Sequence, residues 1–160
     1  MLKILIRNTS LDDLEQLPAL YKEGFDKDTD IDLMHRTFNR LLNNDDYLFY
    51  SAVLPNGKLV GYMSVVINHD IVEQCKDFAT VWNIRTKKEY RRQKIATRML
   101  EHIEKQLKER NIDFIALITR EKCLAPPSGR SSLVTEVTTT CFNSSSAAAL
   151  ATLSGSSGST

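Results

Sequence analysis

Apolar residues along the chain follow two different periods, and each predicts a different kind of element. Short runs rich in Ile, Val, Leu and aromatic residues are typical of β-strands. They occur at Leu2–Arg7, Tyr47–Leu54, Leu59–Ile67 and Phe78–Thr86. Within the last run we expect Trp82 to pack in the core. Pro55-Asn56-Gly57-Lys58 contains the Asn-Gly pair of a tight hairpin, so the last three strands should form an antiparallel meander.

Helical spacing of apolar residues appears on both sides of this predicted meander. The first helical segment should carry Leu11, Leu14, Leu17, Tyr21 and Phe25 on one face. Pro18 falls inside this segment and lacks a backbone donor, so we expect a kink or a break there. An acidic linker, Asp26–Asp32, precedes a second short helix around Met34–Leu42.

A long amphipathic helix is predicted from Gln93, with Ile95, Met99, Ile103 and Leu107 on its apolar face. Asn111 is suited to a left-handed cap at its end. The run Asp113–Thr119 that follows is nearly all apolar, as expected for a buried parallel strand. Strand, helix and strand then form a right-handed βαβ unit. The fold class is therefore α/β (α+β), with a mixed central sheet.

The composition of the chain changes abruptly after Lys122. From residue 123 to 160, Arg130 and Glu136 are the only charged residues, and the last stretch is rich in Ser, Ala and Gly. We expect an ordered domain over 1–122, a divergent segment over 123–142 with a strand at Leu133–Phe142, and a linker-like tail over 143–160. Two origins fit this segment: a native divergent terminus, and a change of reading frame or an appended linker.

The overall charge and the cysteines limit the function classes. A net charge of +1 provides no global field toward nucleic acid or membrane. Cys75, Cys123 and Cys141 are widely spaced, which argues against a disulfide framework or a metal site. The sequence contains neither a secretory signal pattern nor a run of about 20 apolar residues. We therefore expect a cytoplasmic protein that uses no metal.

Positive charge is concentrated where the Phe78–Thr86 strand leads into the long helix. Six basic residues lie between positions 85 and 94, with Glu89 as the single acid. One interpretation of this basic run is a solvated charged loop without a binding role. However, the run ends at a helix start, where unpaired N–H groups and the helix dipole favour anions. This arrangement is suited to a diphosphate.

The segment Arg91-Arg92-Gln93-Lys94-Ile95-Ala96 resembles the acetyl-CoA-binding motif of the GNAT superfamily of N-acetyltransferases. That motif is Arg or Gln, two residues, Gly, one residue, then Gly or Ala. The predicted order of elements over residues 1 to 120 also resembles the family order. The resemblance implies an acyl-CoA N-acyltransferase fold, in which the fourth and fifth strands splay apart and the thioester lies between them.

The resemblance also implies which residues bind the cosubstrate acetyl-CoA. The end of the fourth strand would pair with the pantetheine arm, and the following loop and first helical turn would surround the pyrophosphate. The matching positions are Ile84, Arg85, Thr86, Arg91, Arg92, Gln93, Lys94, Ile95, Ala96 and Thr97.

Two departures from the family pattern bear on activity. Lys94 stands where the family has Gly, which allows a close approach of the backbone to phosphates. Cys123, Pro126 and Arg130 stand where the family has Asn, Ala and a Tyr that protonates the thiolate. The catalytic residues are therefore unassigned.

Candidate catalytic residues lie in and before the Phe78–Thr86 strand. Glu73, with His69 and Asp70, belongs to the preceding loop, near where an amine would enter. The alternative for each is an ordinary surface-loop residue with no catalytic role. Asn83 lies in the strand and is placed either to bind substrate or to pair within the sheet.

The resemblance implies an N-acetyltransferase that transfers acetyl from acetyl-CoA to a primary amine by direct attack in a ternary complex. The acceptor would be a small molecule or a peptide, and the resemblance implies a homodimer as one assembly. One alternative is a catalytically impaired CoA-binding relative. Another is a small nucleic-acid-binding module that uses the basic turn, although near-zero net charge argues against nucleic acid as a partner.

Overall fold

The computed structural model describes residues 2–25, 28–72, 76–117 and 140–143. Their strands form one six-stranded sheet in the order β1-β2-β3-β4-β5-β6. All neighbours are antiparallel except β4 and β5, which are parallel. The predicted mixed sheet with an antiparallel meander is therefore confirmed. The strand bounds are β1 Leu5–Asn8, β2 Tyr47–Val53, β3 Leu59–Asn68, β4 Phe78–Thr86, β5 Phe114–Leu117 and β6 Thr140–Asn143.

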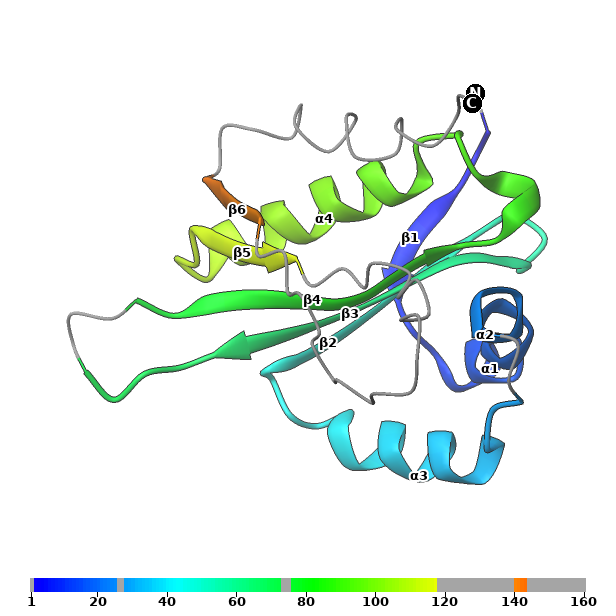
Figure 1. Ribbon diagram of the computed structural model, residues 1–160, viewed down its shortest axis with the longest axis horizontal. Helices are drawn as coiled ribbons and strands as arrows, with labels where there is room; N and C mark the ends of the chain where they lie inside the picture. Colours follow the sequence, from blue (N-terminus) through cyan, green and yellow to red (C-terminus); the bar gives the residue numbers. More distant parts are fainter. Residues whose placement is uncertain (1, 26–27, 73–75, 118–139, 144–160) are drawn as a thin grey trace, which may run out of the picture.

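Helices cover both faces of this sheet (Figure 1). The long helix α4 lies on one face, and the three helices that follow β1 lie on the other. In the described ranges, no helix combines the length and the apolar character that crossing a bilayer requires. The helix bounds are α1 Leu11–Leu14, α2 Leu17–Phe25, α3 Ile31–Leu41 and α4 Ile95–Glu109, with a 3₁₀ turn, η1, at Lys88–Tyr90.

The first helical segment breaks at residues 15 and 16, as the proline predicted. Pro18 is the second residue of α2, where its missing N–H has no helical partner to lose. The buried carboxylate of Asp13 fixes α1 against β1. It accepts hydrogen bonds from Arg7 Nη1 and Nη2 at 2.6 and 2.9 Å, and from the Ser10 N–H at 2.9 Å. Burial alone would raise the pKa of Asp13, but these hydrogen bonds lower it on balance.

Two apolar cores follow from this layering. The predicted face of α4 is fully buried: Ile95, Met99, Ile103 and Leu107 are each at most 2% exposed and pack against β2, β3 and β4. On the opposite face, a smaller core joins α1, α2 and α3 to β2 and β3. The helical period therefore identifies the buried side of α4, whereas Leu11 and Leu42, which the period also placed on apolar faces, are 51% and 52% exposed.

The predicted turns are present, with small shifts at the element ends. Gly57 closes the β2–β3 hairpin with a φ of 81°, and Asn111 adopts the left-handed conformation with a φ of 60°. The first strand begins at Leu5 rather than Leu2. Of the strand predicted at Leu133–Phe142, only its last residues fall within the description, in β6. The rest of that strand lies outside the described residues, as do residues 118 and 119.

Trp82 does not pack in the core, so that prediction is wrong. The β3–β4 register pairs Ser64 with Asn83 and Val65 with Val81, which leaves Trp82 as the extra residue of a β-bulge. Its side chain is 52% exposed. The bulge shifts the alternation of β4, so Val81 and Ile84 pack on the α4 side while Asn83 faces the side of α1 to α3. Sequence periodicity cannot detect such a shift.

Candidate active site

The basic segment after β4 forms a compact turn at the start of α4. Arg92 and Lys94 have φ values of 63° and 59°, and both lie in the left-handed region. Each such residue other than glycine costs about 1–2 kcal/mol in backbone energy. Strained backbone of this kind is concentrated at functional sites. The left-handed conformation of Lys94 also explains why glycine suits this position.

Several consecutive backbone N–H groups in this turn have no hydrogen-bond acceptor among the described residues. The Arg91 N–H donates to the Lys88 carbonyl at 3.2 Å, and the Arg98 N–H donates to the Lys94 carbonyl at 3.0 Å. Between these two, the N–H groups of residues 92 to 97 have no acceptor among the described residues. Six free N–H groups at the N-terminus of a 15-residue helix form a cradle for an anion.

Packing fixes the position of this cradle relative to the sheet. Gly61 on β3 lies beneath the first turn of α4, and a Cβ at this residue would lie 3.1 Å from Cγ2 of Ile95. On the outer side, Lys58 Nζ binds Glu89 at 2.8 Å and lies 5.2 Å from the ring centre of Tyr90. Arg91 Nε donates to the Thr86 carbonyl at 3.4 Å. The turn is therefore braced on both sides.

The charges of the basic segment do not all belong to the cradle. Lys58 neutralises Glu89, and its hydrogen bond lowers the pKa of that carboxyl. Arg92 and Lys94 are exposed, and neither forms an ion pair with a described acid. Arg85 faces the other side of the sheet, where its guanidinium carbon lies 5.3 Å from the ring centre of Tyr21. The cradle is thus positive because of Arg92 and Lys94, with Arg91 at its edge.

Among the described residues, the second half of β4 has no partner strand on the edge that faces β5, and we call this its open edge. β5 pairs with β4 only at Ala79 to Val81. The Lys87 N–H donates to the Val60 carbonyl at 3.0 Å, so by alternation the backbone of Arg85 also faces β3. The backbone groups of Ile84 and Thr86 then face away from β3. Extended ligands that carry amides bind to such an edge by adding to the sheet.

The catalytic candidates differ in their surroundings. Asn83 Nδ2 donates to Ser64 Oγ at 3.3 Å on the face of α1 to α3. His69 is held between Asp77, 2.7 Å from Nδ1, and Asp46, 2.8 Å from Nε2. These contacts raise the pKa of His69, so a smaller fraction of its imidazole is unprotonated and able to accept a proton at neutral pH. Asp70 Oδ1 accepts a hydrogen bond from the Val72 N–H at 3.0 Å in the same loop. Glu73 lies outside the described residues, as do Cys123, Pro126 and Arg130.

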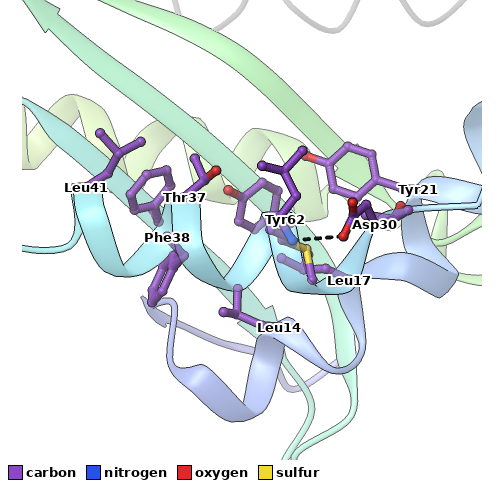
Figure 2. A pocket seen from close by; sticks show the side chains of 12 residues that line it. Leu14, Leu17, Tyr21, Asp30, Thr37, Phe38, Leu41 and Tyr62 are labelled. Atoms are coloured by element: carbon purple, nitrogen blue, oxygen red, sulfur yellow. Dashed lines mark hydrogen bonds between the residues drawn. The ribbon is translucent and has the colours of Figure 1, made fainter.

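A pocket lies between α3 and the sheet, and the sequence pattern does not predict it (Figure 2). Its volume is about 330 Å³, and its walls come from α1, α2, α3 and the two residues before α3 on one side and from β2 and β3 on the other. Tyr21 and Tyr62 lie at one end and Leu41 and Phe38 at the other. Tyr21 packs against the smaller core, as its helical spacing predicts, but spacing alone does not show that it also forms a pocket wall. We call this cavity the α3 pocket.

Three comparisons relate this site to known proteins. A family model described as "Acetyltransferase (GNAT) family" matches residues 11–125. No curated protein matches the sequence significantly.

Solved structures of similar fold include a GNAT family acetyltransferase from Staphylococcus aureus, with a TM-score of 0.65 and 20% identity over 82% of this chain and 98% of that one. An aminoglycoside 6'-N-acetyltransferase from Acinetobacter baumannii has a TM-score of 0.63 and 19% identity, over 76% and 82% of the two chains. The aminoglycoside enzyme AAC(6')-Iy, in complex with a CoA-containing bisubstrate analogue, has a TM-score of 0.62 and 19% identity, over 76% and 82%. At this identity the structural likeness concerns the fold.

Proposed function

This chain belongs to the GNAT family of acetyltransferases, and from that premise we propose that it transfers an acetyl group from acetyl-CoA to a primary amine within a ternary complex. The neutral amine nitrogen attacks the thioester carbonyl. A C–N bond forms, the C–S bond breaks, the nitrogen loses a proton and the thiolate gains one. The products are an N-acetyl amide and CoA. Residues 1–122 would form the catalytic domain.

The observation that carries this proposal is the cradle of free N–H groups next to an open strand edge. The fit to acetyl-CoA rests on donor chemistry. Six N–H groups and the side chains of Arg92 and Lys94 suit the two charges of a pyrophosphate. The outward backbone of Ile84 and Thr86 suits the amides of a pantetheine arm. One ligand with both parts would span the cradle and the edge.

Each part of the site then has a separate task. The cradle binds and orients the nucleotide end of the cosubstrate, because its dipole and N–H groups are fixed before binding. The open edge of β4 aligns the thioester with the sheet. Arg85 has its backbone toward β3 and its side chain on Tyr21, so we propose that it shapes the acceptor side rather than the phosphate side.

Two measurements on the full chain test this proposal. Calorimetry with CoA should detect binding, and millimolar CoA without a heat signal would refute the proposal. Thiol release from acetyl-CoA, measured over a panel of primary amines, should then depend on the amine. CoA binding without amine-dependent release would instead identify a CoA-binding relative that lacks turnover.

A further inference from the structure

The α3 pocket points to the chemical class of the acceptor. Resting on the proposed function, we infer that the acceptor is a primary amine joined by a short aliphatic tether to an apolar, aromatic body, and that this body occupies the α3 pocket. The inference rests on the lining of the pocket, its size and its distance from the open edge of β4.

The lining of the pocket is apolar over most of its surface. Of its twelve lining residues in the described part of the chain, nine are aliphatic or aromatic, and the polar ones are Thr29, Asp30 and Thr37. Burial raises the pKa of Tyr21 to about 12, and it also raises that of Tyr62. Both phenols are therefore neutral at physiological pH. A pocket of this kind binds apolar surface, with the few polar groups fixing orientation.

Aromatic rings form two walls of the pocket. Tyr21 and Tyr62 are arranged edge to face with their centres 6.1 Å apart. Phe38 and Phe49 form a tilted pair with centres 5.4 Å apart. Such walls favour an aromatic guest, because edge-to-face contacts add to the burial of area. The volume of about 330 Å³ accommodates one ring with its tether, since a cavity of about 150 Å³ already holds benzene.

Charge in the pocket argues against a polycationic acceptor. Among the described residues that line it, Asp30 is the only acid. One of its oxygens already accepts the Leu33 N–H at 2.9 Å as the N-cap of α3. A polyamine or an aminoglycoside carries several ammonium groups, and each would require a partner when desolvated. The lining residues that the structure describes supply at most one such partner.

The distance to the open edge of β4 sets the length of the tether. Tyr62 is paired in register with Arg85 of β4, and the Arg85 guanidinium lies over Tyr21. The pocket wall is therefore one strand away from the strand whose outer edge carries the proposed thioester. Neighbouring strands are about 4.8 Å apart, so the path from β3 to the far edge of β4 is about 7 Å. A tether of about two to four methylene groups spans that distance.

Steady-state kinetics with a homologous series test this inference. The substrates are phenyl-(CH₂)n-amines with n from one to five, compared with ethylamine and spermidine. We expect kcat/KM to peak at intermediate n and to exceed that of ethylamine at least tenfold, because burying one ring is worth more than 1.4 kcal/mol. A flat series, or spermidine as the best substrate, would overturn the inference and leave the proposed function intact.

A matched pair of variants on α3 locates the binding site. Thr37 lines the pocket, whereas Asn39 is exposed on the same helix and does not line it. Thr37→Phe should fill the cavity and raise KM for the best phenylalkylamine about tenfold, whereas Asn39→Phe should leave this KM nearly unchanged. The affinity for CoA should change little in either variant. Equal effects of the two variants would refute the placement.

A result without turnover would separate the two proposals. If CoA binds but no amine releases thiol, the proposed function fails. Calorimetry of phenylpropylamine against the CoA-bound protein then tests the pocket alone. Binding that Thr37→Phe abolishes would support an apolar amine as its ligand, and absence of binding to the unmodified protein would overturn it.

Discussion

Gly61 on β3 and Ile95 at the start of α4 approach so closely that a Cβ on Gly61 would be in tight contact with its neighbours. A Cβ on Gly61 would lie 3.1 Å from Ile95 Cγ2 and 3.2 Å from both Met99 Sδ and the Arg85 carbonyl. This contact sets the height of the helix start above the sheet. It therefore determines where the cradle of N–H groups lies relative to the end of β4.

Gly61→Val should lower the free energy of unfolding by about 1–3 kcal/mol, because it overpacks this contact. It should also weaken CoA binding severalfold by displacing the first turn of α4. Denaturant unfolding and calorimetry measure the two effects.

Gly57→Ala is the matched control for this variant. Gly57 has a φ of 81° and open space around its Cα, so alanine there is strained but displaces nothing. We expect a loss of about 1–2 kcal/mol in stability with unchanged affinity for CoA. Unchanged affinity in Gly61→Val as well would refute the proposed link between Gly61 and the cradle.

Lys94 combines a strained backbone with a positive charge, and two substitutions separate them. Lys94→Gly removes both features, whereas Lys94→Ala removes only the charge and keeps the φ of 59°. The free energy of unfolding of Lys94→Gly, measured with denaturant, should exceed that of Lys94→Ala by about 1 kcal/mol. Both should bind CoA with a weaker dependence on salt than the unmodified protein, because one cation is lost. Equal stability of the two variants would show that the backbone at residue 94 is not strained.

Arg92 is expected to act on phosphate and not on the pantetheine arm. Arg92→Ala should weaken CoA binding about tenfold, since a hydrogen bond to a charged group is worth about 1.5 kcal/mol. Pantetheine has no pyrophosphate, so its affinity should stay the same. Lys105, exposed farther along α4, provides the control Lys105→Ala, which should change neither affinity. A parallel loss for both ligands in Arg92→Ala would contradict the assigned role.

His69 should make stability depend on pH near neutrality. Its hydrogen bonds to Asp46 and Asp77 raise its pKa in the folded state above the ordinary value of 6.5. The stabilisation is therefore complete below about pH 6.5 and is lost as the pH rises through the folded-state pKa. His69→Gln should lower Tm at about pH 6 and have a smaller effect at about pH 9. A difference in Tm that is constant with pH would show that the imidazole is not charged in this cluster.

The sequence predicted most of the fold because most of its signals are local. The break before Pro18, the buried face of α4 and the left-handed Asn111 each depend on a few neighbouring residues. The motif at Arg91 to Ala96 likewise identified a helix start, and the structure locates that start at Ile95. The binding roles assigned to these residues stay predictions.

The failures involve residues whose surroundings come from distant segments. Trp82 was assigned to the core because β4 was read as a regular strand, but the register with β3 makes it a bulge. Arg85 was grouped with the other basic residues, yet the same bulge directs it toward Tyr21 of α2. The α3 pocket has walls from five elements, and no single stretch of sequence contains it.

The chain by itself therefore determined most of the elements, the buried face of α4 and the start of that helix, because hydrophobic period and helix-end chemistry act over a few residues. Tertiary structure alone decided which side of the sheet each β4 residue faces and where the α3 pocket lies. Those features depend on strand register and on packing between helices and strands far apart in the sequence. The proposed phosphate end of the site is thus visible in the sequence, whereas the proposed acceptor end exists only in the folded protein.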